Sequence, residues 1–117
     1  SVTDEHKNAC VHKKQSPELV YENGDIDECY YGEINISEAY SKFKKERAED
    51  EGKYLEKHIN VNHDVVIKCN DGCIKVKYTW RDKKNLVVTQ DFNGGETVIY
   101  FSESNSGTNV LVKSFPD

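Results

Sequence analysis

The sequence predicts an α+β fold in which an N-terminal β-hairpin precedes one α-helix that packs on a four- to five-stranded antiparallel sheet. Three observations predict it: one amphipathic segment with helical spacing, a series of short apolar segments separated by turn residues, and a length of 117 residues, which suits one domain. Within this single domain (1–117) we expect an N-terminal arm (1–17), a hairpin (18–29), a helix (36–51) and an antiparallel sheet (61–113).

The first expected elements are the arm and the hairpin. The arm is polar, ends at Ser16-Pro17, and is interpreted as irregular or as a short edge strand. Residues 19–22 and 25–28 then surround Asn23-Gly24, the dipeptide that a type I′ turn prefers. We therefore expect the two strands of the hairpin to meet at Asn23-Gly24.

The one strong helical pattern follows. Asn35 can cap a helix, and Glu38 three residues later completes a capping-box sequence. The residues that then recur at helical spacing are Ile36, Ala39, Tyr40, Phe43 and Arg47. Gly52 is the expected stop of the helix. This pattern predicts one amphipathic helix over residues 36–51.

The rest of the chain is typical of short strands in a meander. Residues 65–67 are apolar and precede a turn at Asn70-Asp71-Gly72. In the next strand, apolar and polar residues alternate with a period of two, in the order Ile74, Lys75, Val76, Lys77, Tyr78, Thr79, Trp80 and Arg81. Further strands are expected at 86–89, 98–101 and 110–112. Short connections between them imply antiparallel neighbours.

This alternation implies a locally basic sheet surface. If the apolar residues of the strand face the helix, the other face carries Lys75, Lys77 and Arg81, and Lys113 of the last strand is added to this candidate binding face. We favour a solvated strand face, and an anion or RNA groove is the alternative. The net charge of −5 gives no general attraction to nucleic acid or anionic membrane. No apolar run approaches the roughly 18 residues of a membrane span, so we expect no membrane partner.

Four cysteines in a small domain favour an oxidising, secretory compartment. The sequence leaves three pairings open. Cys10 and Cys29 flank the expected hairpin, and Cys69 and Cys73 flank a turn, so we favour the pairs Cys10–Cys29 and Cys69–Cys73. Together with His58 and His63, the second pair also has the residue types of a zinc site. A disulfide is the simpler interpretation, and we expect no metal and no cofactor.

Five segments, taken in their order along the chain, are similar to the motifs of a known protein family. They are Cys29-Tyr30-Tyr31-Gly32, Tyr54-Leu55-Glu56-Lys57-His58, Tyr78-Thr79-Trp80, Val98-Ile99-Tyr100-Phe101 and Val110-Leu111-Val112-Lys113. Over residues 29–113 this series resembles the fungal guanyl-specific ribonucleases. In that family the corresponding features are a cysteine–tyrosine entry into the helix, a Tyr-Pro-His stretch, a Tyr-Glu-Trp strand, an Arg-Val-Val-Phe strand and a last strand that ends in His.

The resemblance places the family's catalytic positions on Glu56, Thr79, Val98 and Lys113. Those enzymes use a base to activate a 2′-hydroxyl, a His to protonate the leaving oxygen and an Arg to stabilise the phosphoryl group. Thr79 cannot act as a base near neutral pH, and Val98 carries no charge. A lysine such as Lys113 is a poor acid–base group without strong burial. The resemblance therefore implies a ribonuclease-like scaffold that is not an enzyme.

Catalytically empty ribonuclease-like proteins form a large class of secreted effectors in plant-pathogenic fungi, notably the powdery mildews. The chain resembles them in size, in the cysteine near its helix and in the missing catalytic set. Membership would imply a monomer that is delivered into the host cell, binds host plant protein or RNA, and is detected by an intracellular immune receptor. Members often carry a cysteine near the C-terminus, whereas this chain ends Phe115-Pro116-Asp117.

Two other hypotheses belong to different classes. The first is an active secreted guanyl-type ribonuclease that uses Glu56 with His58 or Lys113. The second is a secreted binding or inhibitor module of unrelated ancestry that shares only the α+β layout.

Overall fold

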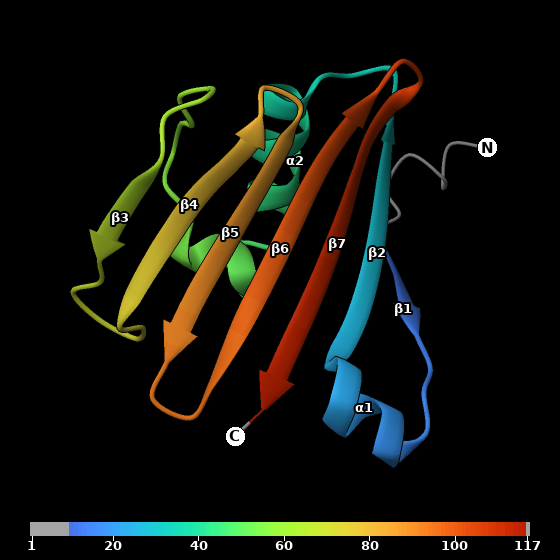
Figure 1. Cartoon of the computed structure of the whole chain (residues 1–117), viewed down its shortest axis with the longest axis vertical. Coiled ribbons are helices and arrows are strands. Elements are labelled where there is room, and N and C mark those ends of the chain that lie inside the picture. The colour runs from blue at the N-terminus through green and yellow to red at the C-terminus, as the bar shows by residue number, and fades with distance from the viewer. Residues whose placement is uncertain (1–9, 117) are drawn as a thin grey trace.

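A computed structural model describes residues 10–116 of the chain. Its strands form one antiparallel seven-stranded sheet in the order β1-β2-β7-β6-β5-β4-β3 (Figure 1). The elements in chain order are β1 (Cys10–Lys13), α1 (Pro17–Asn23), β2 (Asp25–Gly32), α2 (Ile36–Glu46), the 3₁₀ helix η2 (Glu51–Tyr54), β3 (Val65–Lys68), β4 (Lys75–Asp82), β5 (Asn85–Phe92), β6 (Gly95–Ser104) and β7 (Gly107–Pro116). The α+β class is confirmed, and the sheet has more strands than expected because β1 and β2 extend it beside β7.

The prediction of a hairpin at Asn23-Gly24 is wrong, because α1 occupies that place. Ser16 caps this helix, its Oγ accepting a hydrogen bond from the Leu19 N–H at 3.4 Å, and Pro17 begins the first turn. Gly24 ends it with a φ of 80°, and its N–H donates to the Val20 carbonyl. The N-terminal arm is described only from Cys10 onward, and there it forms the edge strand β1; the rest of the arm lies outside the described residues.

Helix α2 begins as expected and ends earlier than expected. The Asn35 side chain accepts the Glu38 N–H at 2.9 Å, and the Glu38 carboxylate accepts the Asn35 N–H at 3.3 Å, which is the capping box. The helix ends at Glu46 rather than near residue 51. Gly52 lies in η2 instead, where an added Cβ would collide with the Lys44 carbonyl oxygen. Gly52 therefore allows η2 to pack closely against the end of the helix.

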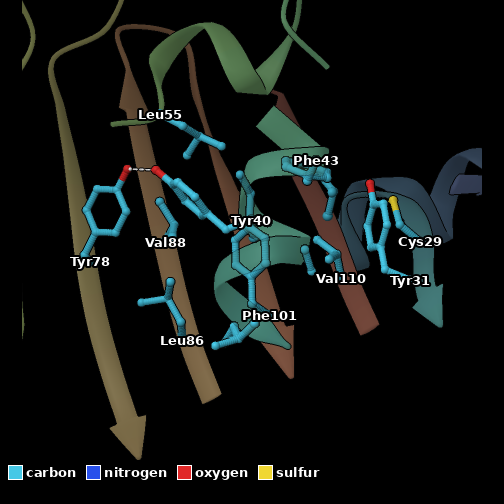
Figure 2. Close-up of a cluster of buried hydrophobic side chains, with 14 of the residues drawn as sticks. Cys29, Tyr31, Tyr40, Phe43, Leu55, Tyr78, Leu86, Val88, Phe101 and Val110 are labelled. Carbon is cyan, nitrogen blue, oxygen red and sulfur yellow. Dashed lines mark hydrogen bonds between the residues drawn. The ribbon is translucent and has the colours of Figure 1, made fainter. Parts of the chain in front are cut away.

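One face of α2 packs on the sheet and forms the core (Figure 2). Tyr40 and Phe43 are fully buried, and both rings contact Phe101, at centroid distances of 5.5 and 5.6 Å. Val76, Tyr78 and Trp80 face this core as predicted. Ile74 was expected there too, but it precedes β4 and is 49% exposed.

Both favoured disulfides are confirmed. Cys10–Cys29 joins two directly opposite residues of β1 and β2, and Cys69–Cys73 closes the turn between β3 and β4. Two disulfides in a domain of this size are typical of a secreted protein. Neither helix in residues 10–116 has the length and apolar composition needed to cross a bilayer.

Candidate functional site

The sheet has one covered face and one open face. Helix α2 lies behind the sheet in Figure 1, and the viewer looks onto the face that no described helix covers. Because side chains alternate along a strand, the residues between the core positions all point to this open face. On β4 these are Lys75, Lys77, Thr79 and Arg81.

Three of the four positions carried over from the ribonucleases lie on the open face. Val98 of β6 and Lys113 of β7 are directly opposite each other, and Thr79 lies on β4, with β5 between it and β6. Val98 is 8% exposed and offers only methyl groups. The Lys113 ammonium lies 5.7 Å from the centre of the Tyr100 ring, in a cation–π contact. This face therefore offers one hydroxyl and one cation at those positions, without a carboxylate or an imidazole.

Glu56, the fourth position, is separated from the other three. It follows η2 on the helix-covered side of the sheet, where its backbone contacts two tyrosines. The Glu56 N–H donates to the Tyr78 hydroxyl at 2.8 Å, and the Glu56 carbonyl accepts from Tyr40 at 2.6 Å. Because Tyr40 uses its one proton on this carbonyl, the 2.7 Å bond between the two hydroxyls runs from Tyr78 to Tyr40 (Figure 2). Burial raises the pKa of both tyrosines, so both stay neutral and hold this closed ring of hydrogen bonds.

Glu56 lines a cavity of about 190 Å³ on the helix side together with His58 and His63. The walls also include Tyr78 and Trp80 from β4. Glu56 and His58 are therefore neighbours, but Lys113 points to the opposite face of the sheet. A reaction that used Glu56 with Lys113 would have to act through the sheet.

Two of the four residues in the alternative zinc site, Cys69 and Cys73, are not free to bind zinc. Cys69 and Cys73 are bonded to each other, so neither supplies the thiolate that zinc binds. Across the described part of the chain, no three His, Cys, Asp or Glu side chains are grouped so that they could hold a metal ion.

The open face has a groove of about 430 Å³, and Arg81 is the one residue of the predicted basic face that lines it. Val87, Tyr100 and Leu111 give it an apolar floor, and Glu28 and Arg81 contribute charges of opposite sign. The signal that could have found it is the alternation within β5, β6 and β7, which sends these residues away from the core. A second cavity, of about 620 Å³, lies between α1 and the turn from β5 to β6 and includes none of the predicted site residues.

The residues of the predicted basic face lie on two separate parts of the sheet. Lys75, Lys77 and Arg81 lie along β4, whereas Lys113 lies on β7, and β5 and β6 separate the two strands. Sequence reasoning missed Lys68 of β3, which is directly opposite Lys75. We call Lys68, Lys75, Lys77 and Arg81 the β3–β4 basic strip. Its one ion pair within residues 10–116 is a 3.9 Å contact between Lys75 and Asp91.

A second charged cluster, on the covered face, holds β1, β2 and α2 together. His12 Nδ1 lies 2.7 Å from an Asp27 carboxylate oxygen, and His12 Nε2 lies 3.4 Å from Asp25. Arg47 donates to Asp27 and to Glu51, both at 2.8 Å. The hydrogen bond to Asp27 raises the pKa of His12. Burial alone would raise the pKa of Asp27, but the hydrogen bonds from Arg47 and His12 outweigh it and lower that pKa.

Comparisons with protein-family models, with curated proteins and with solved structures find no match to this chain.

Proposed function

We propose that the chain is a secreted, catalytically inactive ribonuclease-like effector that acts by binding a host plant protein. One observation carries this proposal: Thr79, Val98 and Lys113 share the open face of the sheet, yet together they supply no acid–base pair. In-line cleavage of RNA needs a base for the 2′-hydroxyl and an acid for the leaving oxygen, and each contributes roughly 100-fold or more. Delivery into the host cell and detection by an intracellular immune receptor belong to the same proposal.

The composition of the groove supports a protein partner over RNA. An apolar floor of Val87, Tyr100 and Leu111 beside charges of both signs is the make-up of a protein interface. The Glu28 carboxylate at the groove is paired with Lys13 at 2.6 Å, so this pair adds no net positive charge to attract phosphate groups, and the chain as a whole carries a charge of −5. Contact with RNA along the β3–β4 basic strip is the secondary expectation, and it predicts binding that weakens steeply with added salt.

Capture of proteins from plant extract tests the binding half of this proposal. The natural chain is compared with a Tyr100→Arg/Leu111→Lys variant, in which the groove floor is charged, and with a Lys42→Glu/Lys45→Glu variant of the exposed side of α2. We expect one partner that the natural chain and the α2 variant retain and the groove variant loses. Equal capture by all three proteins would contradict a role for the groove.

A further inference from the structure

Strand β3 forms an open edge of the sheet. Among the described residues it pairs only with β4, and no described segment lies beyond it (Figure 1). An edge strand presents a row of backbone N–H and C=O groups that another strand can pair with. Proteins commonly protect such edges by covering them or by keeping them polar. Here Val65 and Val66 on the edge are 45% and 57% exposed, so the first half of this open edge is apolar, and Lys68 is the one charged residue of the strand.

The two sides of β3 differ in chemistry. On the covered side, Val65 and Ile67 line the cavity of about 190 Å³ whose walls include Tyr78 and Trp80. An added strand would place alternate side chains beside this cavity, which has an apolar part formed by Val65, Ile67, Tyr78 and Trp80 and a polar part formed by Glu56, His58 and His63. Added strands gain affinity from backbone hydrogen bonds and specificity from pockets that receive alternate side chains.

On the open side, β3 carries Val66 and Lys68, which lie directly opposite Lys77 and Lys75 of β4. Lys68 and Lys75 are directly opposite each other, an arrangement of like charges that destabilises an antiparallel pair. Within residues 10–116, Lys68, Lys77 and Arg81 form no ion pair. Carboxylates placed beside these cations would relieve the repulsion. Charge complementarity therefore indicates acidic side chains on this side of the occupant.

We infer that the free edge of β3 is a docking site for an extended peptide segment of a partner protein, in which apolar and acidic residues alternate. The backbone of the segment pairs with β3. Its apolar side chains point toward the cavity beside Trp80, and its acidic side chains point toward Lys68 and Lys77. This site is separate from the groove on the open face, and it does not depend on whether the chain cleaves RNA.

Binding of a synthetic peptide to the full chain tests this inference. The probe is a labelled peptide of about eight residues that alternates glutamate and valine, a length that exceeds the short strand at both ends. There are three matched control peptides. The first has lysine in place of glutamate, the second has the same residues in a scrambled order without alternation, and the third has N-methyl groups on four consecutive central residues. Affinity is measured by fluorescence anisotropy, and the site by amide hydrogen exchange at residues 65–68.

We expect saturable binding of the alternating acidic peptide alone, with slowed amide exchange in β3. Lys68→Glu/Lys77→Glu should weaken this binding at least 10-fold and give binding to the lysine peptide. Lys42→Glu/Lys45→Glu, which makes the same charge change on α2, should leave the affinity within about twofold, and thermal melting of both variants confirms that they fold. No binding, equal binding of the scrambled or N-methylated peptide, or protection confined to other strands would overturn the inference.

Discussion

At the scale of single residues, the closed ring of hydrogen bonds around Glu56 shows how buried polar groups fix a loop. Tyr78 accepts the Glu56 N–H and donates to Tyr40, which in turn donates to the Glu56 carbonyl. Each group has its partner, so the loop after η2 is held against the core without an ion pair. Removing one hydroxyl leaves at least one of the buried groups unpaired.

We therefore predict that Tyr78→Phe lowers the free energy of unfolding by about 1–3 kcal/mol, the usual cost of leaving a buried donor unsatisfied. Urea denaturation measures the change. Tyr30→Phe is the matched control, because the Tyr30 hydroxyl also bonds a backbone group, the carbonyl of Ser106, but the residue is 46% exposed. We expect the control to change stability by no more than about 0.5 kcal/mol. Equal losses of unfolding free energy in the two variants would contradict the stabilising role of the hydrogen-bond ring around Glu56.

His12 gives a prediction about pH. Its pKa is raised above 6.5 by the hydrogen bond to Asp27, so the folded chain holds the proton more tightly than the unfolded chain. The resulting stabilisation is fully present below the unfolded pKa and is lost as the pH rises through the raised, folded pKa. His12→Gln should therefore lower the melting temperature more at pH 5.5 than at pH 8. A variant that lowers it equally at both values would show that the His12–Asp27 contact carries no proton-linked stability.

Residues on strands were more predictable than residues on loops. The period of two placed Thr79, Lys75 and Lys77 opposite the core, and the structure has them on the open face. Lys68 was missed because only the pairing of β3 with β4 brings it opposite Lys75. The separation of Glu56 from Lys113 was equally invisible, because nothing local indicates on which side of the sheet a loop returns.

At the scale of elements, the two disulfides constrain very different lengths of chain. Cys10–Cys29 spans 19 residues and ties the edge strand β1 to β2, whereas Cys69–Cys73 spans 4 residues of one turn. In the chain-entropy account, a longer closed loop removes more freedom from the unfolded state. The first bridge should therefore matter more to global stability, and the second should act mainly on the end of β3.

Replacing each pair by serine measures this difference. We expect Cys10→Ser/Cys29→Ser to lower the free energy of unfolding by about 3 kcal/mol, and Cys69→Ser/Cys73→Ser by about 2 kcal/mol. Guanidinium denaturation of the two variants beside the natural chain gives both values. A larger loss from the short loop than from the long one would contradict the ranking.

The N-terminal elements show why one local signal can have two outcomes. Asn23-Gly24 suits both a type I′ turn and the end of a helix, because each can use a glycine with positive φ. The Ser16 cap and Pro17 in the first turn favour the helix over the type I′ turn. This Ser-Pro signal for a helix start was present in the sequence. The end of α2 was harder to predict, since it is set by contact with η2 and not by the helical pattern.

At the scale of the whole molecule, strands from the two ends of the described chain pair with each other inside the sheet. β2 pairs with β7 along eight residue pairs, so residues near 25–32 lie beside residues 107–114. The meander from β3 to β7 follows from short turns and was predictable, but this long-range pairing has no local signature. The pairing of β2 with β7 also completes the groove on the open face, because β2 supplies Glu28 to one side of it.

The central claim is that the chain binds a partner without cleaving RNA. The most direct test is the rate of cleavage of a guanosine-containing dinucleotide between pH 5 and pH 8, with an active guanyl-specific ribonuclease as the positive control. The account predicts a rate equal to that of buffer at every pH, for the natural chain and for Glu56→Ala alike. A bell-shaped dependence on pH that disappears in Glu56→Ala would contradict the claim and identify a working acid–base pair.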